Sequence, residues 1–493
     1  MGMIQSAPQM DKAIHSWLRP IKLIFVPGLT TPLLERVADT LLDRFRFHGH
    51  NVQETPDDST DILLTSAPFN QPLNWREANL FTARRRFGLQ HTPTIVTMIQ
   101  VEPEQLESAL EHFRQALAKP DPDLKDFEIP GLAPDAYRTL IEQGQRGGPL
   151  LALERVLQAQ SKSIRIILVV GKDHPLYAYH FDLVGAYPRS DGADAERFYD
   201  DIVFRVATVA STHEITNHQV MDEIVPRLQW EGLTTPQAMR LAGQELGKRG
   251  FFTEMVLVER LVHVPAISDA VASQYSEGCF ATWDPRLQAL IATVTGSSRP
   301  VDKTNITEDD LAVIVRARPD GQGAVVRHVE GKRNDPPSSE AVEMIDMDSL
   351  LPRIRLGSGW DVQAEVPVAR SKLHGHRGIA AFDPKKVEFA PLDPAYYCYP
   401  VSCATEAQAH GIKSAFSRAQ SLQKPNDPRQ VVFTVLPGHG AVIVEKWSPG
   451  KTPFQAIWEA MDAGQLQVTP RVPQGPMAYV AAEDGRMILQ MDE

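Results

Sequence analysis

Cysteine is scarce in this sequence, with three residues among 493. So sparse and odd a set (Cys279, Cys398 and Cys403) does not make the disulfide framework of a small secreted domain and suits a reducing compartment. No apolar run approaches the roughly 20 residues that a membrane span needs. The first residues, MGMIQSAPQMDKAIHSW, also lack the apolar core of a secretory signal. We therefore expect a cytoplasmic protein that has no membrane partner.

Positive charge is also in short supply, since 50 lysines and arginines stand against 62 aspartates and glutamates. The net charge of −12 leaves no basic field that would attract nucleic-acid phosphates. Nucleotide motifs are missing too, because the segment VPGLTTP lacks the lysine of a phosphate-binding loop and no GxGxxG follows a strand-like run. Nucleic acid is not an expected partner, and a hydrophobic fraction of 43% indicates well-filled cores.

The first 150 residues alternate between strand-like and helix-like segments. The run IKLIF predicts a buried strand, and the apolar residues of 33–45 recur at helical spacing after it. Thr31 is suited to cap that helix and Pro32 to begin it. Two more strands are predicted at 61–67 and 92–101. This alternation is typical of a parallel sheet that helices cover on both faces.

Two further domains are predicted after a connection that is rich in proline, glycine and aspartate. A second strand–helix series opens at 163–171, and the pentapeptide GLTTP that precedes the first helix returns at 232–236. Beyond about residue 300, short strand-like runs with Gly and Pro turns dominate, as in β-rich barrels or sandwiches. We therefore predict two doubly wound, Rossmann- or flavodoxin-like α/β domains at 1–150 and 151–300, followed by a β-rich, barrel-like domain at 301–493.

Three histidines stand in patterns that a fold alone does not require. In VVFTVLPGHGAVIVEKW, two β-branched runs flank a turn that needs Pro and Gly, yet His439 lies between two glycines. Glycines impose no Cβ clash, so they allow His439 to approach another group closely. In SKLHGHRG, the two-residue period of a strand places His374 and His376 on one face, where they could share an ion or a substrate. A plain hairpin turn and histidines hydrogen-bonded at a strand end are the structural alternatives.

A pair of acids stands in the segment from 274 to 310. Glu277 precedes a glycine, ahead of a helix that we predict to start near Asp284-Pro285, and Asp302 follows the strand-like RPV. Functional residues concentrate at such boundaries between elements. Ordinary surface acids are the alternative, and Cys279 fits either a reactive thiol or a small buried hydrophobe.

The segment QYSEGCFATWDPRLQALIATVTGSSRPVDKTNI resembles the metal-binding region of the L-arabinose and L-fucose isomerase superfamily. The phrase VLPGHGAVIVEKW is similar to the strand turn that supplies a metal histidine in that superfamily, and the order of two α/β domains and a β-rich domain is alike. The resemblance implies that Glu277, Asp302 and His439 bind a divalent metal, and that Glu277 and Asp302 are the catalytic acids.

Some positions depart from the family pattern. Cys279 stands where an acid is usual, and the single His439 replaces a tandem pair. His328 in VVRHVEG is the counterpart of an upstream histidine. Together with His374 and His376, it is predicted to contact the substrate.

The activity implied by the resemblance is aldose–ketose isomerisation. A hard cation, Mn²⁺ or similar, would bind the oxygens of a small polyhydroxy substrate, and the paired carboxylates would move a proton through an enediol. The resemblance also implies a homo-oligomer. Two alternatives stay open: a non-catalytic sugar- or metabolite-binding protein of the same architecture, and a hydrolase or lyase in which His374, His376 and His439 surround zinc.

Overall fold

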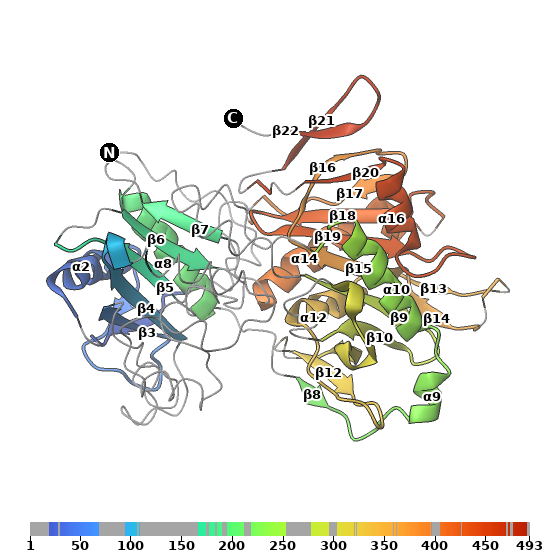
Figure 1. Cartoon of the computed structure of the whole chain (residues 1–493), viewed down its shortest axis with the longest axis horizontal. Coiled ribbons are helices and arrows are strands. Elements are labelled where there is room, and N and C mark those ends of the chain that lie inside the picture. Colours follow the sequence, from blue (N-terminus) through green and yellow to red (C-terminus); the bar gives the residue numbers. More distant parts are fainter. Residues whose placement is uncertain are drawn as a thin grey trace. The chain divides into compact units, whose positions relative to one another are not determined.

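The structure is a computed structural model, shown in Figure 1 with the chain coloured from its N-terminus in blue to its C-terminus in red. The residues that it describes are 19–27, 30–68, 94–105, 108, 166–173, 177–182, 185–189, 195–211, 218–252, 278–294, 303–319, 321, 323–357, 359–360, 362–394, 396, 405–424, 426–469, 472–473 and 477–490.

The chain divides into two compact units. The N-terminal unit holds the described residues within His15–Thr212, and the C-terminal unit holds those within His213–Met255 and Gln274–Glu493. The predicted boundaries at 150 and 300 do not coincide with this division. One sheet continues across residue 150 and another across residue 300, because strands on both sides of each boundary pair with one another.

The sheet of the N-terminal unit has seven strands in the order β2-β1-β3-β4-β5-β6-β7. Its first five strands in that order run parallel, and β6 and β7 extend it as an antiparallel edge. The predicted parallel sheet is therefore present, with an antiparallel hairpin added. Its strands are β1 (Lys22–Phe25), β2 (Asn51–Val52), β3 (Ile62–Pro68), β4 (Thr94–Val101), β5 (Ile166–Val170), β6 (Tyr177–Asp182) and β7 (Gly185–Arg189).

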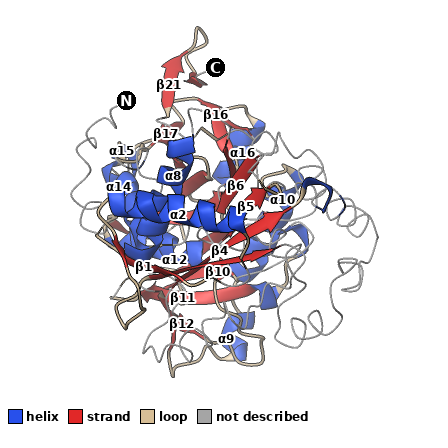
Figure 2. Cartoon of the chain, turned by 90° about the vertical axis from the view of Figure 1, so that its left-hand side faces the viewer, coloured by secondary structure: helices blue, strands red, loops and turns tan. Residues whose placement is uncertain are grey.

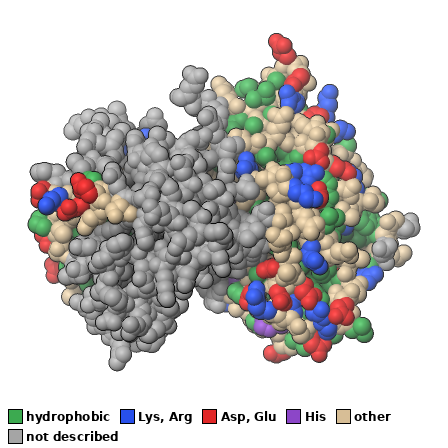
Figure 3. Space-filling view, in the orientation of Figure 1, with side chains coloured by type: hydrophobic (Ala, Val, Ile, Leu, Met, Phe, Trp, Pro, Cys, Tyr) green, Lys and Arg blue, Asp and Glu red, His purple; other side chains and the backbone are tan. Residues whose placement is uncertain are grey.

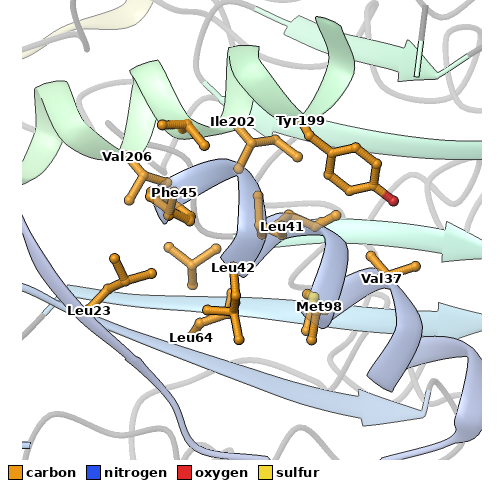
Figure 4. Packing of buried hydrophobic residues seen from close by; sticks show 14 of the residues in the cluster. Leu23, Val37, Leu41, Leu42, Phe45, Leu64, Met98, Tyr199, Ile202 and Val206 are labelled. Carbon is orange, nitrogen blue, oxygen red and sulfur yellow. The ribbon is translucent and has the colours of Figure 1, made fainter. Parts of the chain in front are cut away.

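Helices α2 (Pro32–Phe47) and α8 (Ala195–Ser211) pack against this sheet. The predicted start of α2 is confirmed, since the Thr31 side chain accepts a hydrogen bond from the backbone N–H of Leu34. Figure 4 shows Leu41 of α2 and Ile202 of α8 in one cluster with residues of the strands, and Figure 2 shows the two helices together. These two described helices therefore cover the same face of the sheet, and the doubly wound arrangement stays a prediction.

The C-terminal unit is built on a nine-stranded mixed sheet in the order β17-β18-β19-β15-β9-β10-β11-β12-β8. Among the described strands of this sheet, the outermost pairs, β17 with β18 and β12 with β8, are parallel and the others are antiparallel. Within the described part of the chain the sheet is open, with β17 and β8 at its edges, so these strands do not form the predicted barrel. Its strands are β8 (Gln219–Val220), β9 (Cys279–Asp284), β10 (Ala289–Thr293), β11 (Leu311–Ala317), β12 (Ala324–Arg327), β15 (Ala369–Gly375), β17 (Val387–Phe389), β18 (Val431–Leu436) and β19 (Gly440–Lys446).

Two smaller sheets and several helices complete this unit. One sheet pairs β13 (Arg353–Arg355) with β14 (Glu365–Pro367), and the other has β20 (Leu466–Thr469), β16 (Gly378–Phe382), β22 (Met487–Gln490) and β21 (Ala478–Ala481) in that order. The helices are α9 (Arg227–Glu231), α10 (Thr235–Lys248), α12 (Ser339–Asp346), α14 (Glu406–Arg418), α15 (Gln420–Gln423) and α16 (Gln455–Asp462), and the short 3-10 turns are η3 (Lys303–Asn305), η4 (Glu308–Asp310) and η5 (Met347–Ser349).

The two faces of the large sheet carry different helices. On one face α12 packs against β9, β10, β11 and α14, while α10 and α16 pack against each other and against β9 and β19. Neighbouring side chains of β15 point to opposite faces. Lys372 pairs with Asp348 just after α12, and Ser371 donates to Glu445, whose carboxylate also accepts from the first N–H groups of α16.

The helix predicted near Asp284-Pro285 is wrong. Strand β9 ends at Asp284, and β10 returns antiparallel to it after a turn over 285–288. The Asp284 carboxylate accepts from the backbone N–H groups of Arg286 and Leu287, both at 2.8 Å. Aspartate caps turns and helix starts by the same chemistry, and here the fully buried β-type runs on both sides select the hairpin.

Charge is mixed on the surface of the C-terminal unit. In Figure 3, acidic and basic side chains alternate over the visible face of its described part. Among the described helices, none combines the length and the apolar character that crossing a bilayer requires.

Candidate metal centre

Four side chains of the C-terminal unit converge on one point. They are Glu340, His374, His376 and His439, and each offers one ligand atom within 4.8 Å of the others. The imidazole ring centroids lie 5.3 Å apart for His374 and His376, 4.8 Å for His374 and His439, and 4.9 Å for His376 and His439. All three histidines are buried. The cluster has the residue types and the closeness that a single divalent ion needs.

His374 is held by the centre of the sheet. It lies near the end of β15, where it pairs with Cys279 of β9 on one side and with Val442 of β19 on the other. A residue flanked by two paired strands has little freedom, so the direction of its side chain is fixed by the pleat. The position of His374 in the cluster is therefore fixed by the sheet.

His439 is brought to the cluster by the hairpin between β18 and β19. Leu436 pairs with Gly440, and Gly438 has a positive φ of 64°, which favours glycine. A Cβ on Gly440 would lie 2.0 Å from the carbonyl oxygen of Gly375. Gly440 thus allows the hairpin to approach the end of β15, which is where His374 and His376 stand.

His376 stands on the bend that follows β15. The preceding Gly375 is packed so tightly that a Cβ there would lie 2.2 Å from the ring of Phe251. The ring centroid of His376 lies 5.3 Å from that of His374, although His376 stands one residue beyond the end of β15. Two glycines, one in each segment, let the three rings meet.

Glu340 comes from the first turn of α12. The hydroxyl of Ser338 donates to its Oε2 at 3.0 Å, and its Oε1 lies 4.0 Å from Nε2 of His374. The Glu340 side chain is 15% exposed, against 2% for the side chain of His374. The cluster is therefore most open beside the carboxylate.

The ring nitrogens that face one another have no hydrogen-bond partner. Nδ1 of His374 donates to the carbonyl of Ala441 at 3.2 Å, and Nδ1 of His439 lies 3.2 Å from the amide Nε2 of Gln408. The remaining nitrogens, Nε2 of His374, Nε2 of His439 and both of His376, are buried without a partner in the described part of the chain. Buried polar atoms are almost always paired, so several such nitrogens at one point indicate a site that a ligand can occupy.

The three imidazoles are neutral at ordinary pH. Burial lowers the pKa of all three, and the neighbouring His374 adds to burial in lowering the pKa of His376 to about 3. Neutral imidazoles offer lone pairs rather than protons, which is the state that binds metal ions. Cys279 behaves differently, because burial and then the charge of Glu340 raise the pKa of its thiol. It is a small buried residue and not a reactive thiolate.

The sequence predictions included the three histidines of the cluster but did not include Glu340. Glu277 and Asp302, the predicted acids, lie outside the described residues. His328 is not part of the cluster and follows β12, where its carbonyl accepts from the N–H of Val225. Glu340 was not predicted, because an acid after two serines at the start of a helix reads as a capping residue.

Comparison with known proteins adds little. Neither protein-family models nor curated proteins match the sequence, so the resemblance to the isomerase superfamily stays a prediction. Among solved structures, an L-fuculose 1-phosphate aldolase matches with a TM-score of 0.25 and 14% identity, over 46% of this chain and 80% of that one. A likeness at that level says nothing about what this chain does.

Proposed function

We propose that the C-terminal unit is the catalytic part of a zinc-type metalloenzyme, a lyase or hydrolase, with His374, His376, His439 and Glu340 as the residues that hold the ion. The convergence of buried, unpaired imidazole nitrogens carries this proposal. Of the alternatives open from the sequence, it is the one in which three histidines surround zinc.

The donor set favours a transition metal over a hard cation. Imidazole suits Zn²⁺, Cu²⁺, Fe²⁺ and Ni²⁺, whereas Mn²⁺ and Mg²⁺ prefer sites made mainly of oxygen. Three imidazoles and one carboxylate form the cluster. The prediction of Mn²⁺ depended on two acids beside His439, and the described cluster supplies one.

Groups behind the imidazoles orient them for an ion. The Ala441 carbonyl fixes the proton of His374 on Nδ1, which leaves the lone pair of Nε2 directed into the cluster. For His439, turning the Gln408 amide by 180° places Oε1 where Nε2 now lies, and the two orientations differ only in hydrogen bonding. Nδ1 of His439 then donates to Gln408, and Nε2 becomes a ligand.

Glu340 can also take part in proton transfer, because it stands on the more exposed side of the cluster. When bound, a zinc-type ion polarises a carbonyl oxygen or lowers the pKa of a water molecule. A carboxylate at the entrance can hold the proton that such chemistry moves, and its Oε2 is kept in place by the hydroxyl of Ser338. Isomerisation of a polyhydroxy substrate through an enediol would need a second acid, for which Glu277 and Asp302 remain the predicted residues.

The experiment begins with the metal. The purified full chain is dialysed against a chelator and titrated calorimetrically with Zn²⁺, Co²⁺ and Mn²⁺, beside a His374→Ala/His376→Ala variant and a His328→Ala control. We expect one Zn²⁺ per chain, bound more tightly than Mn²⁺, lost in the double variant and kept in the control. Binding of Zn²⁺ by the double variant with unchanged affinity would refute the site.

Activity separates the reaction classes. The zinc-loaded chain is assayed for aldol-type cleavage, ester and amide hydrolysis and aldose–ketose exchange with the same small oxygenated compounds. Cleavage or hydrolysis that is lost in Glu340→Gln supports the proposal. Aldose–ketose exchange would instead support the isomerase, and ligand-induced stabilisation of the metal-free chain without any turnover would support a binding protein.

A further inference from the structure

A pocket lies at the ends of β9, β15 and β19 that are far from the metal cluster. Arg370 is the second residue of β15 and stands four residues before His374, so the two positions are roughly 13 Å apart at about 3.3 Å per residue. No residue of the metal cluster lines this pocket. The lining residues that matter for binding are Trp283, Asp284, Arg286, Trp360, Arg370 and Trp447.

Arg370 is held between two tryptophans. Its guanidinium carbon lies 5.5 Å from the ring centroid of Trp360 and 4.9 Å from that of Trp447, and the two rings are nearly perpendicular. Nη1 donates to the carbonyl of Lys451 at 2.7 Å. The Nε atom is buried and has no hydrogen-bond partner in the described part of the chain. The guanidinium is thus held by the two tryptophan rings and by the hydrogen bond from Nη1, and its Nε–H has no partner.

Trp283 supplies a second donor without a partner. The residue is only 6% exposed, and its indole Nε1 makes no hydrogen bond within the described residues. In contrast, the Nε1 of Trp447 donates to the carbonyl of Pro367 at 2.7 Å. Both groups that lack a partner in this pocket carry N–H donors, so the missing ligand is one that accepts hydrogen bonds.

Arginines outnumber acids around the pocket and its groove. Arg370 and Arg286 line it, and the guanidinium of Arg353 lies 5.8 Å from the ring centroid of Trp283. The carboxylate of Asp284 is already engaged, because it accepts from the hydroxyl of Thr235 and from two backbone N–H groups. Arg353 is paired with Glu365, whose Oε1 lies 3.5 Å from its Nε. The case for an acceptor in the pocket therefore rests on the two N–H donors without a partner, one of which belongs to a charged guanidinium that binds anionic acceptors more strongly than neutral ones.

The size of the pocket limits the group that enters. Its cavity volume is about 90 Å³, which is small beside the roughly 300–1,000 Å³ of pockets that hold a whole drug-sized ligand. It shares Pro285, Arg286 and Val362 with an open groove that Gln288, Arg353 and Glu365 also line. A small charged head can occupy the pocket while the rest of a larger molecule lies along the groove.

We propose that this pocket binds the carboxylate group of a small organic acid, with the Nε edge of Arg370 and the indole N–H of Trp283 as its donors. A planar carboxylate matches the edge of a guanidinium whose faces are covered by rings. The aromatic walls accommodate the carbon atoms next to the carboxylate. This assignment is independent of the metal centre and of the function proposed for it.

The test uses ligand-detected NMR on the full chain after chelator dialysis, so that no metal ion can bind the probe. Acetate and benzoate are the probes, benzamide is the neutral counterpart of benzoate, and inorganic phosphate is the tetrahedral anion. The variants are Trp283→Phe, which keeps a ring and removes the donor, and Arg370→Lys, which keeps the charge and removes the planar edge. Trp230→Phe is the control, because its Nε1 donates to Glu308 outside the pocket.

We expect both carboxylates to bind, with affinities that fall about tenfold in Trp283→Phe and in Arg370→Lys and stay unchanged in Trp230→Phe. Benzamide and phosphate are expected to bind at least tenfold more weakly than benzoate. Equal binding of benzamide or phosphate, or affinities within twofold in both pocket variants, would overturn the proposal. If Arg370→Lys does not fold, Trp283→Phe alone decides.

Discussion

The two ends of β9, β15 and β19 carry opposite chemistry on a common set of strands. At one end the groups without partners are imidazole nitrogens, and a carboxylate stands beside them. In a neutral imidazole, the lone pair of one nitrogen can accept a hydrogen bond or bind a metal ion. At the other end the groups without partners are the N–H groups of Trp283 and Arg370. The same rigid strands thus present acceptors at one end and donors at the other. From the kind of unpaired buried atom we infer the kind of ligand that each end can bind, a cation at the first and an anion at the second.

The largest expected effect comes from breaking only the metal end. In Gly440→Ala the added Cβ would lie 2.0 Å from the carbonyl oxygen of Gly375, so the hairpin has to shift and His439 with it. We expect Zn²⁺ affinity to fall by more than about 100-fold, measured by titration calorimetry, while acetate binding at the tryptophan pocket persists. The control is Gly357→Ala, where an added Cβ meets nothing within 4 Å. Unchanged Zn²⁺ affinity in Gly440→Ala would remove His439 from the site.

A second variant sharpens the difference in charge between the two ends. Glu340→Gln keeps the shape of the side chain and removes its negative charge from the metal end. We expect Zn²⁺ affinity to fall about 10- to 100-fold and turnover to be lost. Glu343→Gln, one turn further along the buried side of α12, is the matched control. An equal loss of affinity in both variants would show that Glu340 acts on the ion only through its negative charge at a distance and is not a ligand.

Acid should affect the stability of the metal-free chain through the three buried imidazoles of the metal cluster. Burial lowers their pKa in the folded chain, to about 3 for His376, while an unfolded chain takes up protons near the ordinary value of 6.5. The contribution of these groups to stability is therefore fully present above pH 6.5 and is lost as the pH falls toward 3. Thermal unfolding of the metal-free chain between pH 8 and 4 should show this fall, and His376→Gln should reduce it. A fall of the same size in the variant would contradict the low pKa.

The smallest effect on either end is expected from Glu445→Gln, which acts between them. The carboxylate of Glu445 accepts from the N–H groups of Phe454 and Ala456 at 2.7 Å, so an amide leaves one of these bonds unmade. We expect a loss of about 2 kcal/mol in the free energy of unfolding, measured by denaturant titration. Zn²⁺ affinity should stay within twofold, because Glu445 is not part of the metal cluster. A marked change in Zn²⁺ affinity would mean that the metal end is coupled to the rest of β19.

Local patterns in the sequence predicted the parts of the site that depend on local structure. The β-branched runs around Pro437 and Gly438 predicted the hairpin, and the two-residue period predicted that His374 and His376 would act together. The two GLTTP segments both precede helices, yet they begin them differently. Thr31 caps α2 with its side chain, whereas Thr234 makes no such bond and Thr235 donates to Asp284. A short motif therefore predicted the start of a helix and not its contacts.

The remaining features depend on tertiary contacts that no short segment contains. Glu340 becomes part of the cluster only because α12 packs over β9 and β10. The Asp284 turn could not be distinguished from a helix start, since aspartate bonds to the following N–H groups in both. The division into units also escaped prediction, because strands β8, β9 and β10 precede residue 300 but pair within the C-terminal sheet.

X-ray absorption at the zinc edge of the loaded full chain tests the central claim most directly. The account predicts three imidazole nitrogens and one carboxylate or water oxygen at about 2.0–2.1 Å from the ion, with the imidazole signal reduced in Gly440→Ala. A sulfur neighbour at about 2.3 Å, or a shell made only of oxygen, would contradict it.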